Sequence, residues 1–186
     1  MPAPSPYRPE FAAALRLFAQ VSEAMHRRGF QRPILVGGAA VEFWSKSAIN
    51  TGDFDLCTPR QEVLEEEMQR AGFVRPDGIG QLLRGWVHPR LKLGFEVVAN
   101  TPMDAAFDRD TLVLVENFSA DGAFVVLSVE DLIADRMGQY ASGTAADRID
   151  QARALYQLHP ALDLVYLERR IREETMGDYG VESVKG

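Results

Sequence analysis

The chain has 186 residues, of which 46% are hydrophobic and 25% are charged, and its formal net charge is −7. These values suit a globular protein of one domain, or a compact domain with a helical extension. The acidic balance argues against broad electrostatic binding to nucleic acid, which needs a basic surface. Cys57 is the single cysteine, which excludes an internal disulfide and a cysteine-based zinc site. Because no stretch reaches about 18 apolar residues and the start lacks the apolar segment of a signal peptide, we expect a cytoplasmic protein without a membrane partner.

The first half of the chain predicts helices and strands in alternation. Residues 1–9 are rich in proline and are expected to form a flexible leader. The next segments follow from helical spacing of apolar residues, from short β-rich runs and from glycines that end helices. The expected elements are helix 10–28, strand 33–36, helix 39–44, strand 53–57 and helix 60–70.

The second half predicts further strands and then only helices. Residues 81–100 predict two strands joined near His88-Pro89, because apolar and polar residues alternate clearly in the second of them. The tetrapeptide from Ser119 to Gly122 predicts a hairpin turn between strands 111–116 and 123–127. Ser128, with Asp131 three residues later, is typical of a capped helix start. The expected helices are 128–140, 145–158 and 163–175, and the polar tail 177–186 is expected to fray.

These elements predict an α+β fold, in which a mixed sheet of about six strands flanked by helices carries a C-terminal helical subdomain. The expected organisation is a flexible leader 1–9, an α+β core 10–127, a helical subdomain 128–176 packed on the core, and a flexible tail 177–186.

Two carboxylates on one strand are the feature that points to chemistry. Asp53 and Asp55 share a face, because alternate residues of a strand point the same way. Like charges ~4 Å apart repel by ~4 kcal/mol at an effective dielectric of ~20. A chain tolerates such a pair if it is solvated, shares a proton or binds a cation. The pair Gly37-Gly38 can bring backbone N–H groups close to a phosphate, which makes the cation interpretation the informative one.

The order of these motifs resembles a known family. Gly37-Gly38, then Thr51-x-Asp53-x-Asp55, then Glu96 on a later strand is similar to the nucleotidyltransferase superfamily of the DNA polymerase β type. The segment from Gly122 to Ile133, with Arg136 after it and Asp147 and Asp150 in the next helix, resembles the AbiEii-type toxin branch and its uncharacterised relatives. The resemblance spans about residues 30–158.

The resemblance implies a nucleotidyltransferase-like fold and a set of site residues. In that family the glycine pair opens a helix under the nucleoside triphosphate, and carboxylates of neighbouring strands hold divalent metal. It therefore implies that Asp53, Asp55 and Glu96 are catalytic and bind Mg²⁺ (or Mn²⁺). The residues implied to bind the nucleotide or its phosphates are Gly37, Gly38, Thr51, Lys46 and Arg136.

The implied reaction transfers a nucleoside monophosphate from an NTP such as ATP to an acceptor, with release of pyrophosphate. The acceptor could be RNA such as tRNA, a protein side chain or a small molecule. The implied biological role is a toxin of a toxin–antitoxin or phage-defence system, with an antitoxin protein as a possible partner. The sequence leaves open which NTP is used.

Three positions depart from the family pattern. Relatives often carry Arg just before the Thr-x-Asp-x-Asp run, whereas the nearest upstream basic residue here is Lys46. Arg136 stands where the toxin branch commonly has Lys, and Glu96 stands where Asp is more usual. None of these departures deletes a required charge type outright.

Other interpretations stay open at this point. Gly37-Gly38 could be a plain strand-to-helix turn, and the two aspartates could be a solvated strand face. Arg136 could simply pair with Asp131, Asp147 or Asp150. At the level of the whole chain, the alternatives are a catalytically inactive module that binds a nucleotide or a partner, and a structural protein in which the motifs are coincidental.

Overall fold

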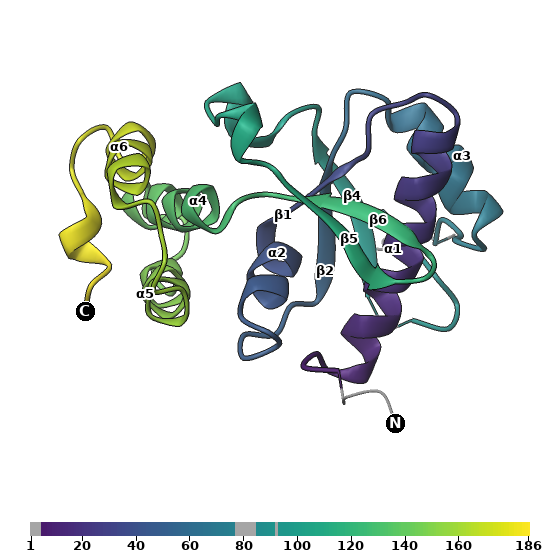
Figure 1. Ribbon diagram of the computed structural model, residues 1–186, viewed down its shortest axis with the longest axis horizontal. Helices are drawn as coiled ribbons and strands as arrows, with labels where there is room; N and C mark the ends of the chain where they lie inside the picture. The colour runs from purple at the N-terminus through teal and green to yellow at the C-terminus, as the bar shows by residue number, and fades with distance from the viewer. Residues whose placement is uncertain (1–4, 77–84, 92) are drawn as a thin grey trace.

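The computed structural model describes residues 5–76, 85–91 and 93–186. Over these ranges the chain forms a mixed sheet of six strands flanked by six α-helices (Figure 1), which confirms the predicted α+β class. The strands are β1 Ile34–Val36, β2 Asp53–Cys57, β3 Trp86–Val87, β4 Gly94–Ala99, β5 Val113–Ser119 and β6 Gly122–Val126. The helices are α1 Pro9–Arg27, α2 Gly37–Trp44, α3 Gln61–Arg70, α4 Val129–Ala141, α5 Arg148–Leu158 and α6 Leu164–Glu174.

The strand order of the sheet is β3-β4-β2-β1-β6-β5. Strand β1 runs antiparallel to β2 and parallel to β6, and β2 runs parallel to β4. The register pairs Val36 with Asp55, so the end of β1 and the start of α2 lie beside Asp55. On the other side of β2, the parallel register with β4 pairs Asp55 with Glu96. The sheet therefore brings the glycine pair and the acidic strand together although a loop separates them in sequence.

One face of the sheet forms the main apolar core under α1 and α3. Phe54 of β2 stacks on Phe95 of β4, with ring centroids 4.5 Å apart, and Phe18 of α1 lies 5.6 Å from Phe124 of β6. The apolar positions that predicted α1 by their spacing are all buried: Phe11, Leu15, Phe18, Val21 and Met25. Burying each such side chain contributes roughly 1.5–3 kcal/mol, so this layer fixes the sheet firmly.

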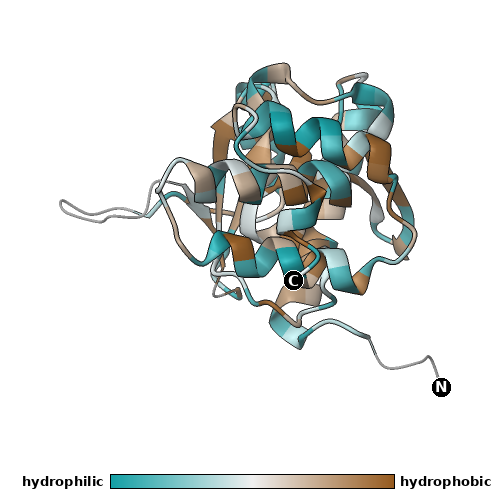
Figure 2. Cartoon of the chain, turned by 90° about the vertical axis from the view of Figure 1, so that its left-hand side faces the viewer, coloured by the Kyte–Doolittle hydropathy of each residue, from teal (hydrophilic) through white to brown (hydrophobic). Residues whose placement is uncertain are grey.

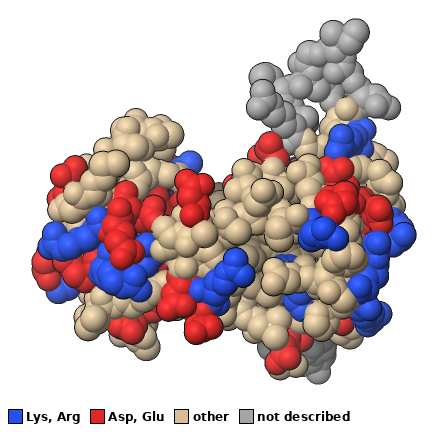
Figure 3. All heavy atoms as spheres, turned by 90° about the horizontal axis from the view of Figure 1, so that it is seen from above, with Lys and Arg blue, Asp and Glu red and all other residues tan. Residues whose placement is uncertain are grey.

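The C-terminal helices lie on the other side of the sheet from α1 (Figure 1), and their buried side chains join the same hydrophobic core. The predicted cap of α4 is confirmed, because the Ser128 hydroxyl accepts a hydrogen bond from the Asp131 backbone N–H. Helix α4 packs between α5 and α6, and hydrophilic and hydrophobic residues alternate along these helices (Figure 2). In the space-filling view, acidic and basic side chains are mixed over these helices instead of forming one basic face (Figure 3).

Several boundaries differ from the sequence-based expectations. Helix α2 begins at Gly37 instead of residue 39, and α5 begins at Arg148 instead of residue 145. The expected long strands in 81–100 are shorter: a turn in which the Leu91 N–H donates to the His88 carbonyl delays β4 to Gly94. Residues 81–84 and 92 of that prediction lie outside the described residues.

Both ends of the described chain are better packed than expected. Tyr7, in the expected flexible leader, stacks on Phe43 of α2 with ring centroids 5.7 Å apart. At the other end, Val181–Ser183 forms a short 3-10 helix, and Val184 is fully buried. The apolar side chains among the polar residues of each end explain this packing. In the ranges given above, no helix combines the length and apolar character needed to cross a membrane.

A buried ion pair joins α4 to α6. Arg170 and Asp131 are both fully buried, and the Arg170 Nε donates to Asp131 Oδ1 at 2.8 Å. Asp131 also accepts from Tyr166 and Thr111, so it links α6 and the segment before β5 to the start of α4. Loss of one partner leaves an uncompensated buried charge, which typically costs ~3–5 kcal/mol.

We therefore predict that Arg170→Met lowers the free energy of unfolding by ~3–5 kcal/mol in urea titrations. Arg169→Ala is the matched control, because Arg169 lies next to Arg170 on α6 but forms an exposed pair with Glu173. Exposed pairs contribute little, so this control should lose less than ~1 kcal/mol. Equal unfolding free energies for the two variants would contradict the structural role of the buried pair.

Candidate functional site

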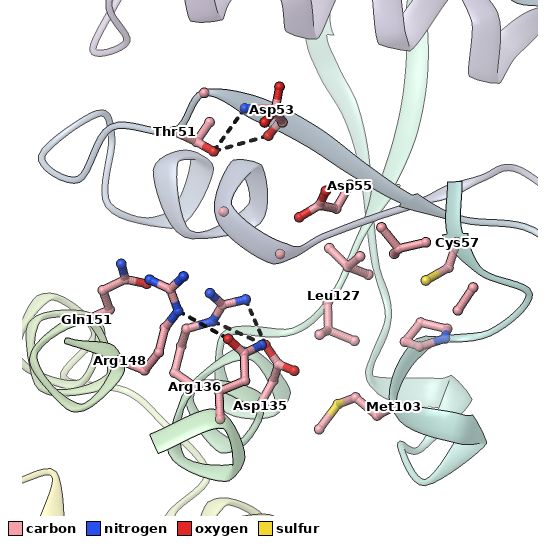
Figure 4. Close-up of a pocket in the computed structure, with 18 of the residues that line it drawn as sticks. Thr51, Asp53, Asp55, Cys57, Met103, Leu127, Asp135, Arg136, Arg148 and Gln151 are labelled. Atoms are coloured by element: carbon pink, nitrogen blue, oxygen red, sulfur yellow. Dashed lines mark hydrogen bonds and ion pairs between the residues drawn. The ribbon is translucent and has the colours of Figure 1, made fainter. Parts of the chain in front are cut away.

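A cavity of about 540 Å³ lies between the sheet and the C-terminal helices. One wall comes from the end of β1, the start of α2 and strand β2, and the opposite wall comes from α4 and α5 (Figure 4). The segment after β4, from Thr101 to Met103, closes one end. Of the residues that the sequence singled out, the cavity is lined by Gly37, Gly38, Thr51, Asp53, Asp55 and Arg136.

The two aspartates of β2 lie on the face predicted from strand alternation. Asp53 is exposed, Phe54 is buried in the core and Asp55 is half-buried. Burial raises the pKa of Asp55, and repulsion from Asp53 and Glu96 raises it further. The charge of Arg136 and a hydrogen bond from the Gly38 backbone oppose that rise in pKa. Asp55 therefore lies in a surplus of negative charge that a cation in the cavity would relieve.

The glycine pair lets the start of α2 approach the acidic strand closely. A Cβ atom on Gly37, whose φ is +61°, would lie 2.1 Å from Asp55 Oδ2. A Cβ on Gly38 would lie 2.5 Å from Thr51 Oγ1. No other residue type fits at Gly37 without displacing the Asp55 carboxylate. The first backbone N–H groups of α2 consequently lie at the cavity wall beside Asp55, in the arrangement that suits an anion at a helix N-terminus.

The helical wall carries two guanidinium groups toward the acidic strand (Figure 4). Arg136 is buried and donates to Asp135 Oδ2 through its Nε and Nη2, at 3.1 and 2.8 Å. The alternative left open by the sequence, a pair of Arg136 with Asp131, Asp147 or Asp150, is not formed; the partner is the adjacent Asp135. Arg148 donates from its Nε to Gln139 Oε1 at 3.1 Å and from Nη1 to the adjacent Asp147 at 3.0 Å.

Sequence reasoning missed most of the helical wall. Asp135, Gln139, Arg148 and Gln151 all line the cavity. Arg136 and Gln139 are three residues apart, as are Arg148 and Gln151, and this spacing places each pair on one face of its helix. The spacing was visible in the sequence, but the face that meets the sheet was not.

Gln151 presents an unsatisfied acceptor in this wall. Its Oε1 is buried and has no hydrogen-bond partner among the described residues, whereas its Nε2 contacts Asp147 Oδ2 at 3.5 Å. Because a carboxylate only accepts hydrogen bonds, this contact orients the amide with its oxygen away from Asp147. A buried acceptor without a partner is costly, so the wall is suited to a ligand N–H or O–H group.

Two expected site residues do not line the cavity. Lys46 is exposed at the end of α2. Glu96 lies in register beside Asp55 and on the same face of the sheet, but it lines a separate pocket with Trp86 and Arg75. Within the described part of the chain, no three His, Cys, Asp or Glu side chains are grouped closely enough to hold one metal ion. The roles expected of Lys46 and Glu96 stay predictions.

The end of the cavity near Met103 is more apolar. Cys57, Val98 and Leu127 line it, and Cys57 follows Asp53 and Asp55 on the same face of β2. Burial, together with the charges of Asp55 and Asp135, raises the pKa of the Cys57 thiol to about 12. A raised pKa favours the thiol over the thiolate at neutral pH, which argues against Cys57 as an activated nucleophile.

We predict that Gly37→Ala lowers the unfolding free energy by more than the ~1–2 kcal/mol cost of a left-handed alanine, because its Cβ also displaces Asp55. Gly52→Ala is the control, since a Cβ on Gly52 meets no atom within 4 Å and its φ is not in the left-handed region. Urea unfolding of both variants measures the difference. If Gly37→Ala were as stable as Gly52→Ala, the close approach of α2 to Asp55 would be refuted.

The chain matches no protein-family model and no curated protein.

Proposed function

We propose that this protein is a metal-dependent nucleotidyltransferase with the fold of the DNA polymerase β type. The observation that carries the proposal is the convergence of six expected residues on one cavity. These residues are Gly37, Gly38, Thr51, Asp53, Asp55 and Arg136. They come from three separate parts of the chain, and coincidental motifs would have no reason to meet.

The charges of the two walls support a phosphate ligand with a bound cation. Asp53 and Asp55 lie on the sheet side, and Arg136 and Arg148 extend from the helical side (Figure 4). Phosphate oxygens would accept hydrogen bonds from the two guanidinium groups and from the N–H groups at the start of α2. A divalent cation would bind to the carboxylates. A cavity of about 540 Å³ falls within the range of small-molecule sites.

The acidic strand fits Mg²⁺ without a third protein ligand. Mg²⁺ prefers oxygen ligands and is usually held by one or two carboxylates together with substrate phosphates. Asp53 and Asp55 would hold the ion, and Glu96, in register beside Asp55, would add negative charge to the same face. The bound ion would stabilise the charge that develops on the transferred phosphoryl group. Mn²⁺ has similar oxygen preferences and could substitute.

The other residues of the cavity would position the nucleotide. The Gly38 backbone N–H already donates to Asp55, so the other N–H groups at the start of α2 would bind phosphate oxygens. The Arg136 guanidinium would neutralise the phosphate charge. In the transfer step, an acceptor hydroxyl oxygen forms a bond to the α-phosphorus of the NTP, and the bond from that phosphorus to the β-phosphate oxygen breaks. The products are the nucleotidylated acceptor, pyrophosphate and the proton of the hydroxyl group.

The acceptor defines the biological role. RNA such as tRNA, a protein side chain and a small molecule all carry suitable hydroxyl groups. The family resemblance favours a toxin of a toxin–antitoxin or phage-defence pair, for which an antitoxin protein would be the partner. Identification of the labelled acceptor decides between these roles.

A catalytically inactive nucleotide-binding or partner-binding module is the second candidate. Two observations favour it. Lys46 lies outside the cavity. Among the described residues, no three acidic, His or Cys side chains are grouped closely enough to hold one metal ion. A module of this kind would bind a nucleotide in the same cavity without turnover.

We predict that the protein, incubated with each α-labelled NTP and Mg²⁺, transfers label to tRNA, protein or a small acceptor and releases pyrophosphate. Asp53→Asn and Asp55→Asn should each lower the rate by at least ~100-fold, because they remove charge that acts on the transition state. Glu116→Gln, which changes an exposed carboxylate of β5, is the control and should keep the rate.

Nucleotide binding without label transfer or pyrophosphate release would favour the inactive module. Full activity in both aspartate variants would contradict the proposed site, whichever acceptor is used.

A further inference from the structure

A buried carboxylate lies behind the loop that joins α2 to β2. Glu42 of α2 is fully buried, and its two oxygens accept hydrogen bonds from three parts of the chain. The Arg8 guanidinium donates to both oxygens, at 2.6 and 3.0 Å. The Thr51 backbone N–H donates to Oε2 at 2.6 Å, and the Ser47 hydroxyl donates to Oε1 at 2.9 Å. Glu42 therefore ties both ends of the loop to α2.

Arg8 reaches this loop from the segment before α1. Besides its two bonds to Glu42, its Nη2 donates to the Thr51 carbonyl at 2.7 Å. Its backbone N–H donates to the Ser47 hydroxyl at 3.1 Å. The flat guanidinium thus spans Glu42 and Thr51 at once, which the single ammonium of a lysine cannot do. Both the N–H and the C=O of Thr51 are fixed by the pair Arg8–Glu42.

The loop needs such a restraint. Lys46 and Ser47 have φ values of +52° and +62°, in the left-handed region where residues other than glycine are disfavoured. Each costs about 1–2 kcal/mol, so the conformation persists only where surrounding contacts determine it. The bonds from Glu42 to Ser47 and Thr51 supply those contacts.

The end of the loop that Arg8 and Glu42 bind is part of the cavity wall. Thr51 lines the cavity, and its hydroxyl donates to the Asp53 carbonyl at 3.1 Å. The same Oγ1 lies against Gly38 of α2, where an added Cβ would come within 2.5 Å. The position of Thr51 therefore sets both the start of the acidic strand and its distance from the glycine pair.

We infer that Arg8 and Glu42 are positioning residues of the site, and that the segment preceding α1 belongs to the functional machinery. Neither Arg8 nor Glu42 lines the cavity. They act through Thr51, which they hold so that Asp53 and Gly38 keep their spacing. The inference rests on the proposed nucleotidyl transfer, and it adds a part of the chain that the sequence motifs do not include.

Kinetics of matched variants test the inference. Arg8→Ala should lower kcat for the Mg²⁺-dependent reaction by about 10- to 100-fold, the size of effect expected when a site group is misplaced by about 1 Å. Arg8→Lys should recover only part of this loss. Arg28→Ala is the control, because Arg28 directly follows α1 and also pairs with a carboxylate, Glu67 of α3. Arg28 does not line the cavity. All rates are measured at a temperature where each variant is fully folded by circular dichroism.

Hydrogen exchange separates positioning from stability. The Thr51 amide should exchange faster in Arg8→Ala than in the wild type, while Arg28→Ala should leave its exchange unchanged. A kcat for Arg8→Ala equal to that of Arg28→Ala would overturn the inference, as would unchanged exchange of the Thr51 amide. If the wild type neither bound nor transferred any nucleotide, the proposed function would fail. The exchange rate of the Thr51 amide would still decide whether the pair Arg8–Glu42 holds the loop.

Discussion

The structure depends on the placement of a half-buried carboxylate against the start of a helix. Asp55 faces Gly37 so closely that a Cβ atom there would lie 2.1 Å from its oxygen. Burial and the charges of Asp53 and Glu96 raise the Asp55 pKa, and these effects oppose ionisation. The antiparallel register of β1 and β2 imposes the contact, so the fold itself sets the charge surplus. A cation and the N–H groups at the start of α2 would offset that surplus within one cavity.

The rest of the molecule holds this arrangement from two sides. The aromatic layer beneath β2 and β4, with Phe54 stacked on Phe95, fixes the strand that carries the aspartates. The buried pair Arg170–Asp131 fixes the helical unit that presents Arg136 and Arg148. The two walls of the cavity share one hydrophobic core, so their spacing is set by packing. A small shift of one wall would change the distance between the guanidinium groups and the carboxylates. The ion pairs Arg170–Asp131 in the helical wall and Arg8–Glu42 beside the sheet wall restrain such a shift.

Local sequence patterns predicted the residues of the sheet wall. They did not predict the helical wall, because long-range packing decides which helix face meets the sheet. Strand alternation correctly placed Asp53 and Asp55 on one face, and the Ser128 cap correctly placed the start of α4. The sequence left open a pair of Arg136 with Asp131, and the structure does not form it, because Asp131 pairs with Arg170, which lies 39 residues later in the chain. The role of Arg8 could not be predicted either, since its bonds to Glu42 and Thr51 close over more than 30 residues. No helical or strand period encodes contacts at that separation.

Metal-dependent nucleotide binding is the property on which the proposed site depends. It is measured by calorimetric titration of each NTP into the wild type and into Asp55→Asn, with Mn²⁺ or Mg²⁺ present and with the metal removed by chelation. We expect the wild type to bind at least one NTP tightly with metal and much more weakly without it, and Asp55→Asn to lose the metal dependence. Binding that is equally tight without metal, or that keeps its metal dependence in Asp55→Asn, would refute a metal site at Asp55.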